Sequence, residues 1–174
     1  MCSSDLPIAS ASFTALGIPG LRQRVTDYHN IGISVATGTT EFRSVSESFH
    51  TMAARTVTLG AALPSPVIAD LGGPYKRLSA TFTLPGDYRT QASFAYFDAA
   101  APKGVSLTAS FGFLGGSSVS LGLDDFSTLA GWDNNWAPSF GTTGSWDITG
   151  AGSTGSSICT ENARFRLANR SGTF

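Results

Sequence analysis

The sequence predicts an all-β protein, an antiparallel β-sandwich of the jelly-roll kind, on three observations. Hydrophobic residues alternate with small polar residues over several short segments, which is the period-two pattern of half-buried strands. Combinations of Gly, Pro, Asp and Ser that favour turns separate these segments. Apart from one ambiguous stretch, no amphipathic helix lies between them. Successive strands without helices favour two packed antiparallel sheets, each with one apolar face.

The alternation is longest over residues 105–113, where Val, Leu, Ala and two Phe residues alternate with Ser, Thr and Gly. It recurs over the segments 31–36, 56–59, 78–84, 119–123 and 163–167. The turn sequences are LPGDY at 84–88, APKG at 101–104 and LGGSS at 114–118. The last of these predicts a tight hairpin between 105–113 and 119–123.

The stretch SVSESFHTMAAR at 44–55 allows two interpretations. Val45, Phe49, Met52 and Ala53 fit one face of a helix, and a strand–loop–strand arrangement fits equally well. Both alternatives stay open at this stage.

We expect one β-sandwich domain over residues 29–174, which is long enough to bury a core. Residues 7–28 carry two prolines and weak patterning, so we interpret them as an edge segment or linker. The leader MCSSDL at 1–6 matches the translation of a common sequencing adapter, and we expect it to be non-native and to pack against nothing. The sequence is compatible with an environmental gene fragment truncated at both ends. Truncation would expose sheet edges and favour self-association.

Composition narrows the classes of partner. The chain has 11 Lys and Arg against 12 Asp and Glu, a formal net charge of -1, and only 13% charged residues against a usual level of roughly a quarter. No basic patch is evident that would bind nucleic acid, and no segment is long enough to span a membrane. Without Cys2 in the leader, Cys159 has no partner for an internal disulfide, and we expect it to be buried or half-buried.

The sequence offers weak support for catalysis. Tyr28 and His29 form a candidate acid–base pair, as in β-sandwich lyases that combine Tyr, His and Arg. The competing interpretation is a histidine at a strand entry that bonds a backbone carbonyl, and we favour it. His50 lies in the ambiguous stretch and gives less support, so we assign no catalytic residues.

Acidic and amide side chains form a second candidate group. Asp124 and Asp125 follow a predicted strand, and Asp133, Asn134 and Asn135 follow shortly after. Such oxygens could hold Ca²⁺, but their spacing does not fit an EF-hand loop. Asp and Asn in turns usually bond their own backbone, and we favour that interpretation. We therefore assign no cofactor and no metal.

The most informative stretch is DDFSTLAGWDNNWAPSFGTTGSWDIT at 124–149, which holds all three tryptophans. Aromatic rings stack on the C–H faces of sugars while neighbouring amides bond sugar hydroxyls. The competing interpretation is that one or two of these indoles plug the end of the sandwich core. Trp146 precedes a strand-like segment and is expected in the core, whereas Trp132 and Trp136 lie in a loop with Asp and Asn and are the better surface candidates. The predicted carbohydrate-binding residues are therefore Trp132, Asp133, Asn134, Asn135 and Trp136.

Several short motifs resemble the DNRLRE-type carbohydrate-binding modules. They are LSATFTLP at 78–85, WDNNWAP at 132–138, SWDIT at 145–149 and RFRLAN at 164–169. The resemblance covers roughly residues 75–170. It implies an extracellular β-sandwich with a Trp- and Asn-rich loop that ends in proline, followed by a strand.

From these observations we expect a non-catalytic, secreted or cell-surface β-sandwich that binds polysaccharide, its signal peptide lost by truncation. The first alternative is a viral or phage structural protein such as a jelly-roll capsid protein, because such proteins share the low charge and the Ser, Thr and Gly content. The second alternative is a polysaccharide lyase built around Tyr28 and His29.

Overall fold

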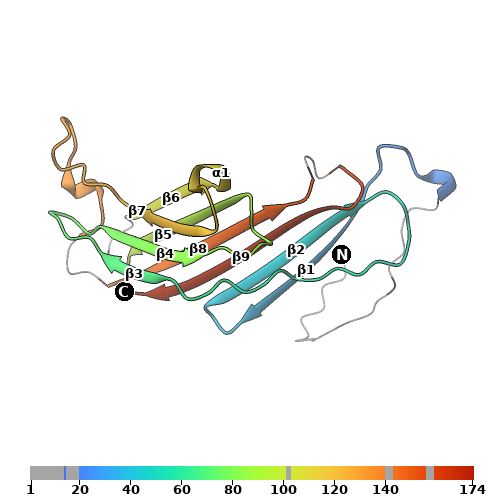
Figure 1. Cartoon of the computed structure of the whole chain (residues 1–174), viewed down its shortest axis with the longest axis horizontal. Coiled ribbons are helices and arrows are strands. Elements are labelled where there is room, and N and C mark those ends of the chain that lie inside the picture. Colours follow the sequence, from blue (N-terminus) through green and yellow to red (C-terminus); the bar gives the residue numbers. More distant parts are fainter. Residues whose placement is uncertain (1–13, 15–19, 101–102, 140–142, 156–158) are drawn as a thin grey trace.

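The chain folds into two antiparallel sheets packed face to face, which confirms the predicted β-sandwich (Figure 1). This computed structural model describes residue 14 and residues 20–100, 103–139, 143–155 and 159–174. The larger sheet has six strands in the order β1-β2-β9-β8-β5-β6, and the smaller has three in the order β3-β4-β7. The strands are β1 (His29–Thr37), β2 (Glu41–Phe49), β3 (Val67–Asp70), β4 (Leu78–Thr83), β5 (Gln91–Asp98), β6 (Gly104–Ser110), β7 (Ser118–Gly122), β8 (Gly144–Ser153) and β9 (Ala163–Thr173). Three short helices complete the described elements, η1 (Gly20–Arg22), α1 (Phe111–Leu114) and η2 (Asn134–Trp136).

The strand pairs are nested along the chain in the manner of a jelly roll. The pair β5–β6 lies within the pair β4–β7, which lies within the pair β2–β9. The pattern departs from a jelly roll at β3, which pairs with β4, and at β8, which pairs with both β5 and β9. The result is one wide sheet with a narrow sheet over part of it.

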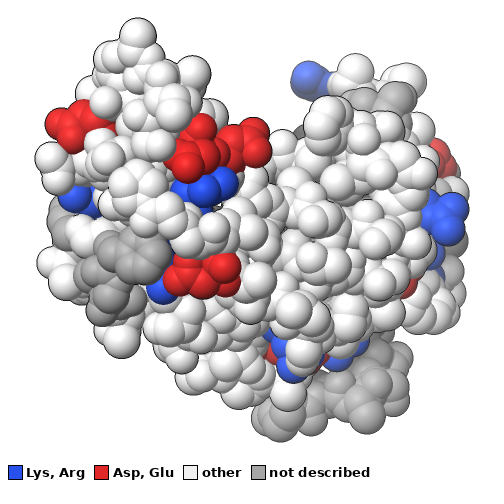
Figure 2. Space-filling model, turned by 60° about the vertical axis from the view of Figure 1, so that its left-hand side comes forward, with Lys and Arg blue, Asp and Glu red and all other residues white. Residues whose placement is uncertain are grey.

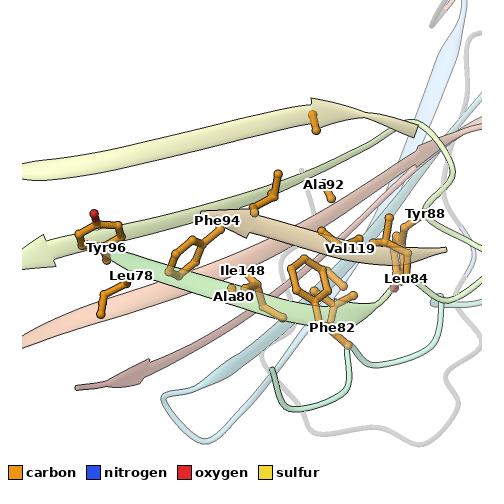
Figure 3. Close-up of a cluster of buried hydrophobic side chains, with 14 residues drawn as sticks. Leu78, Ala80, Phe82, Leu84, Tyr88, Ala92, Phe94, Tyr96, Val119 and Ile148 are labelled. Carbon is orange, nitrogen blue, oxygen red and sulfur yellow. The ribbon is translucent and has the colours of Figure 1, made fainter. Parts of the chain in front are cut away.

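The core lies between the small sheet and strands β5, β8 and β9 (Figure 3). Phe82 and Val119 from the small sheet meet Phe94 and Ile148 from the large one, and all four are buried. Tyr96 is also buried, and its hydroxyl donates to the Lys76 carbonyl at 3.2 Å. Burial raises the pKa of Tyr96 to about 12. We call the face of the large sheet that carries this core its inner face and the opposite side its outer face.

Residues 51–63 cover the inner face beside the small sheet without forming a strand, so the strand predicted at 56–59 is wrong. Their carbonyls accept hydrogen bonds from arginines of the large sheet. Arg164 Nη2 donates to Thr56 at 3.3 Å, Arg43 Nη1 to Gly60 at 3.1 Å and Arg170 Nη1 to Leu63 at 3.0 Å. These side chains provide the hydrogen bonds that a neighbouring strand would otherwise supply.

The predicted hairpin at 114–118 is also wrong, because β6 and β7 belong to different sheets. β6 ends at Ser110, whose hydroxyl accepts from Phe113 N at 3.2 Å and caps the helical turn α1. Gly115 ends the turn with a φ of 69°, in the left-handed region that glycine favours. The turn breaks the alternation and leaves Phe113 83% exposed.

Three smaller expectations also have an outcome. The ambiguous stretch 44–55 forms the end of β2 followed by irregular chain, so the strand–loop alternative holds for its first half. Cys159 is exposed, which corrects the expectation of burial. The leader 1–6 lies outside the described residues, as does most of the segment 7–28.

Candidate functional site

The candidate site is the long connection between β7 and β8, at one end of the sandwich (Figure 1). A small apolar cluster anchors it, in which Tyr75, Leu123 and Ala137 are buried. The Tyr75 hydroxyl accepts from Phe126 N at 2.7 Å and donates to the Asp124 carbonyl at 3.2 Å. One buried tyrosine from the β3–β4 connection thus fixes the start of the loop.

Four aromatic rings meet in this loop. The Trp132 ring lies 5.4 Å from the Tyr75 ring, 5.3 Å from the Phe126 ring and 5.6 Å from the Trp136 ring, measured between centroids. The two indoles are nearly perpendicular, at 77°. Trp132 is half-buried, whereas Trp136 is 63% exposed. Trp132 therefore serves as a fixed support, and Trp136 presents an open ring to solvent.

The polar residues of the loop divide in the same way. Asp133 Oδ1 accepts from Asn135 N at 2.9 Å and caps the helical turn η2, and Asn134 Oδ1 accepts from Trp132 Nε1 at 3.0 Å. Asp133 and Asn134 thus hold the loop together. Within the described part of the chain, the Asn135 amide and the Trp136 indole N–H have no hydrogen-bond partner. These two groups are exposed and available to a ligand.

The structure thus brings all five predicted residues into one turn and adds two that the sequence analysis missed, Tyr75 and Phe126. The sequence contained a weak indication of Phe126, because this residue lies in the Trp-rich stretch itself. It contained no indication of Tyr75, because the position of Tyr75 beside Trp132 depends on how the small sheet packs.

The end of the molecule around this loop is acidic (Figure 2). Lys76 Nζ pairs with Asp70 Oδ2 at 2.9 Å, and Arg77 Nη1 pairs with Asp125 Oδ2 at 3.4 Å. The hydrogen bond from Lys76 lowers the pKa of Asp70, and hydrogen bonds from Ser127 lower the pKa of Asp125.

Two further exposed carboxylates, Asp124 and Asp133, lie in the same loop. The four carboxylates outweigh the two cations, so the site has a negative charge.

Two of the acidic residues that could offer oxygens to Ca²⁺, Asp125 and Asp133, cap turns of their own backbone. Asp125 Oδ1 accepts from Ser127 N at 3.0 Å, which is the same local bond that Asp133 makes. Among the described residues, no three His, Cys, Asp or Glu side chains gather as a metal-ligand set.

Trp146 lies apart from this loop, as predicted. It packs against the main core, and its indole N–H donates to the Thr173 carbonyl at 3.2 Å. The ring covers Gly172, where a Cβ would come within 2.4 Å of a ring carbon.

The candidate acid–base pair lies at the opposite end of the large sheet. His29 begins β1 and its ring contacts Phe49, whereas the Tyr28 ring contacts His50. We expected His29 to contact a backbone carbonyl, but His50 makes such a contact instead. Its Nδ1 lies 2.8 Å from the backbone carbonyl oxygen of Asp27.

Arg55, whose guanidinium lies over the Phe49 ring that His29 contacts, is held by other groups. It pairs with Glu47 at 3.0 Å and Glu161 at 2.8 Å. These contacts stabilise the end of the sheet.

Comparisons with protein-family models, with curated proteins and with solved structures gave no match to this chain. The class of protein is therefore defined by the fold alone, an antiparallel β-sandwich with an aromatic loop at one end. None of the described helices is long and apolar enough to cross a membrane.

Proposed function

We propose that this protein is a non-catalytic, extracellular or cell-surface module that binds polysaccharide through the loop 132–136. The observation that carries the proposal is the exposed Trp136 ring, set at a fixed angle by Trp132 beneath it. A rigid, exposed aromatic ring is a surface on which the C–H face of a sugar stacks with little loss of conformational entropy. Asn135 lies beside the ring with both an amide donor and an amide acceptor for sugar hydroxyls.

The charge of the site favours a class of ligand. Asp124 and Asp133 are exposed in the loop that carries the aromatic rings, and the two nearby cations, Lys76 and Arg77, each pair with another carboxylate. A negative site repels uronate and sulfate groups, most strongly at low ionic strength. We therefore propose uncharged or amino-sugar polysaccharides as ligands.

The test is retention on a panel of insoluble polysaccharides and affinity electrophoresis in soluble ones, with neutral, amino-sugar and uronate members. We expect Trp136→Ala to weaken binding at least tenfold, which is about 1.4 kcal/mol. Trp132→Ala should weaken it as well, through loss of support. Asn135→Ala should have a smaller effect.

The matched control is Phe113→Ala, which removes another highly exposed aromatic ring on a different connection. It should leave retention unchanged. Binding of no polysaccharide, or equal retention of the Trp136 and control variants, would overturn the proposal. Preferred retention on uronate polymers would overturn the assigned ligand class alone.

A further inference from the structure

The edge of β1 that points away from β2 is long and consists of backbone groups with no neighbouring strand. β1 has nine residues and pairs with β2 along its whole length, and it is the end strand of the large sheet. In the part of the chain that the structure describes, no strand pairs with its other side. Every second residue of β1 therefore directs its N–H and C=O groups away from the sheet.

The other edge strands are shorter or closer to a neighbour. β3 has four residues and ends in Asp70, β7 has five, and β6 contacts β7 across the corner of the sandwich. Natural sheets protect their edges with short strands, charged side chains, prolines or bulges. The β1 sequence HNIGISVAT contains no Lys, Arg, Asp, Glu or Pro, and its register with β2 is continuous from His29 to Thr37.

We propose that β1 pairs antiparallel with β1 of a second copy of this chain, around a two-fold axis at Ile33. Ile33 is the midpoint of the strand, so this register pairs all nine residues, from His29 opposite Thr37 to Ile31 opposite Val35. The two large sheets then join into one continuous sheet. Such a contact uses the same surface on both copies and closes after two chains.

Side-chain chemistry supports a second copy as the partner. In this register, residues with side chains on the inner face oppose each other, so Ile31, Ile33 and Val35 form one apolar row across the axis. These side chains are only half-buried in one copy.

On the outer face, Gly32 opposes Ser34, and both are small and exposed. A Cβ at Gly32 would have no atom within 4 Å in one copy. Since β1 has no Lys, Arg, Asp or Glu, no like charges oppose each other when the strand pairs with itself.

The test is the molar mass in solution, measured by light scattering and by sedimentation over a range of concentrations. We expect the full chain to form a dimer. The double variant Gly32→Lys/Ser34→Lys places lysines opposite each other across the axis and should give monomers. Gly32→Glu/Ser34→Glu should give monomers for the same reason. A mixture of the two variants should restore dimers, now with one chain of each kind.

The matched control is Ser106→Lys/Thr108→Lys, which adds the same charges to exposed positions of β6 at the other edge of the sheet. It should remain dimeric. A wild-type chain that stays monomeric up to about 1 mM would overturn the proposal. It would do so even if β1 then proved to bind a different peptide. A dimer that both β1 charge variants leave intact, or that the β6 control dissociates, would overturn it as well.

Discussion

Glu47 is a buried carboxylate held between two arginines. Arg55 Nη1 lies 3.0 Å from one of its oxygens, and Arg164 Nε contacts the other. Removing one partner of a buried ion pair leaves the remaining charges uncompensated, which costs roughly 3–5 kcal/mol. We predict that Glu47→Gln lowers the free energy of unfolding by about 3 kcal/mol, measured by urea denaturation.

The control for this prediction is Glu41→Gln on the same strand. Glu41 pairs with Arg43 at 3.2 Å, but both side chains are more exposed than Glu47, so the loss should be only about 0–1 kcal/mol. Equal losses for the two variants would show that burial of the charge is not what matters.

At the scale of single residues, the sequence could predict the composition of the site but not the roles within it. Trp132 and Trp136 lie in one Trp- and Asn-rich loop, and that pattern is visible in the chain. Which indole is supported and which is exposed depends on Tyr75, which reaches the loop only through packing of the small sheet. The free amide of Asn135 likewise follows from the bonds that Asp133 and Asn134 already make.

Among the elements, β8 depends on two glycines where it passes beneath the turn at 84–88. A Cβ at Gly152 would lie 1.8 Å from the Asp87 carbonyl oxygen, and a Cβ at Gly150 would lie 2.9 Å from a Leu84 methyl carbon. The first contact is with backbone, which cannot move without displacing the turn. We predict that Gly152→Ala lowers the free energy of unfolding by about 4 kcal/mol or more, or prevents folding.

The matched substitution is Gly32→Ala, since a Cβ there meets nothing within 4 Å. Alanine costs less conformational entropy than glycine in a strand, so this variant should be neutral or up to about 1 kcal/mol more stable. Thermal unfolding followed by circular dichroism compares the two. Similar midpoints for both variants would contradict the prediction.

Period-two alternation predicted the strands that are half-buried on one face, including β1, β4 and β7. It failed where another interaction replaced strand pairing. Residues 56–59 alternate, yet arginine side chains donate to the carbonyls of Thr56 and of Gly60, which follows this segment. The run 105–113 also alternates, yet Ser110 and Gly115 cap a helical turn in its last part.

At the scale of the whole molecule, the fold class followed from pattern and composition, but the partition of strands between sheets did not. Period-two alternation predicts that a strand has one buried face, but it does not predict which segment covers that face. Here the small sheet covers only part of the large one, and residues 51–63 cover the inner face beside it. That division depends on contacts between distant segments, which the single sequence does not encode locally.

Stability against acid is also a property of the whole molecule, because it sums over carboxylates on several elements. Hydrogen bonding to Lys76 lowers the pKa of Asp70, and bonds from Ser127 lower the pKa of Asp125. A hydrogen bond from the His50 backbone N–H lowers the pKa of Glu161, and a hydrogen bond from the Arg55 guanidinium lowers it further by a smaller amount. Each folded-state pKa therefore lies below the ordinary value of 3.8 for Asp or 4.5 for Glu.

A lowered pKa means that the unfolded chain takes up protons at a higher pH than the folded protein does. The stability from these three groups is therefore present above about pH 4.5 and is lost as the pH falls through their lowered pKa values. We predict that urea midpoints fall between about pH 4.5 and pH 2, by an amount that the solvent exposure of the three carboxylates keeps small. The triple variant Asp70→Asn/Asp125→Asn/Glu161→Gln should be less stable than wild type at pH 7 and show a shallower fall. Parallel curves for the two proteins would contradict this assignment, because the loss of stability in acid would then come from other carboxylates.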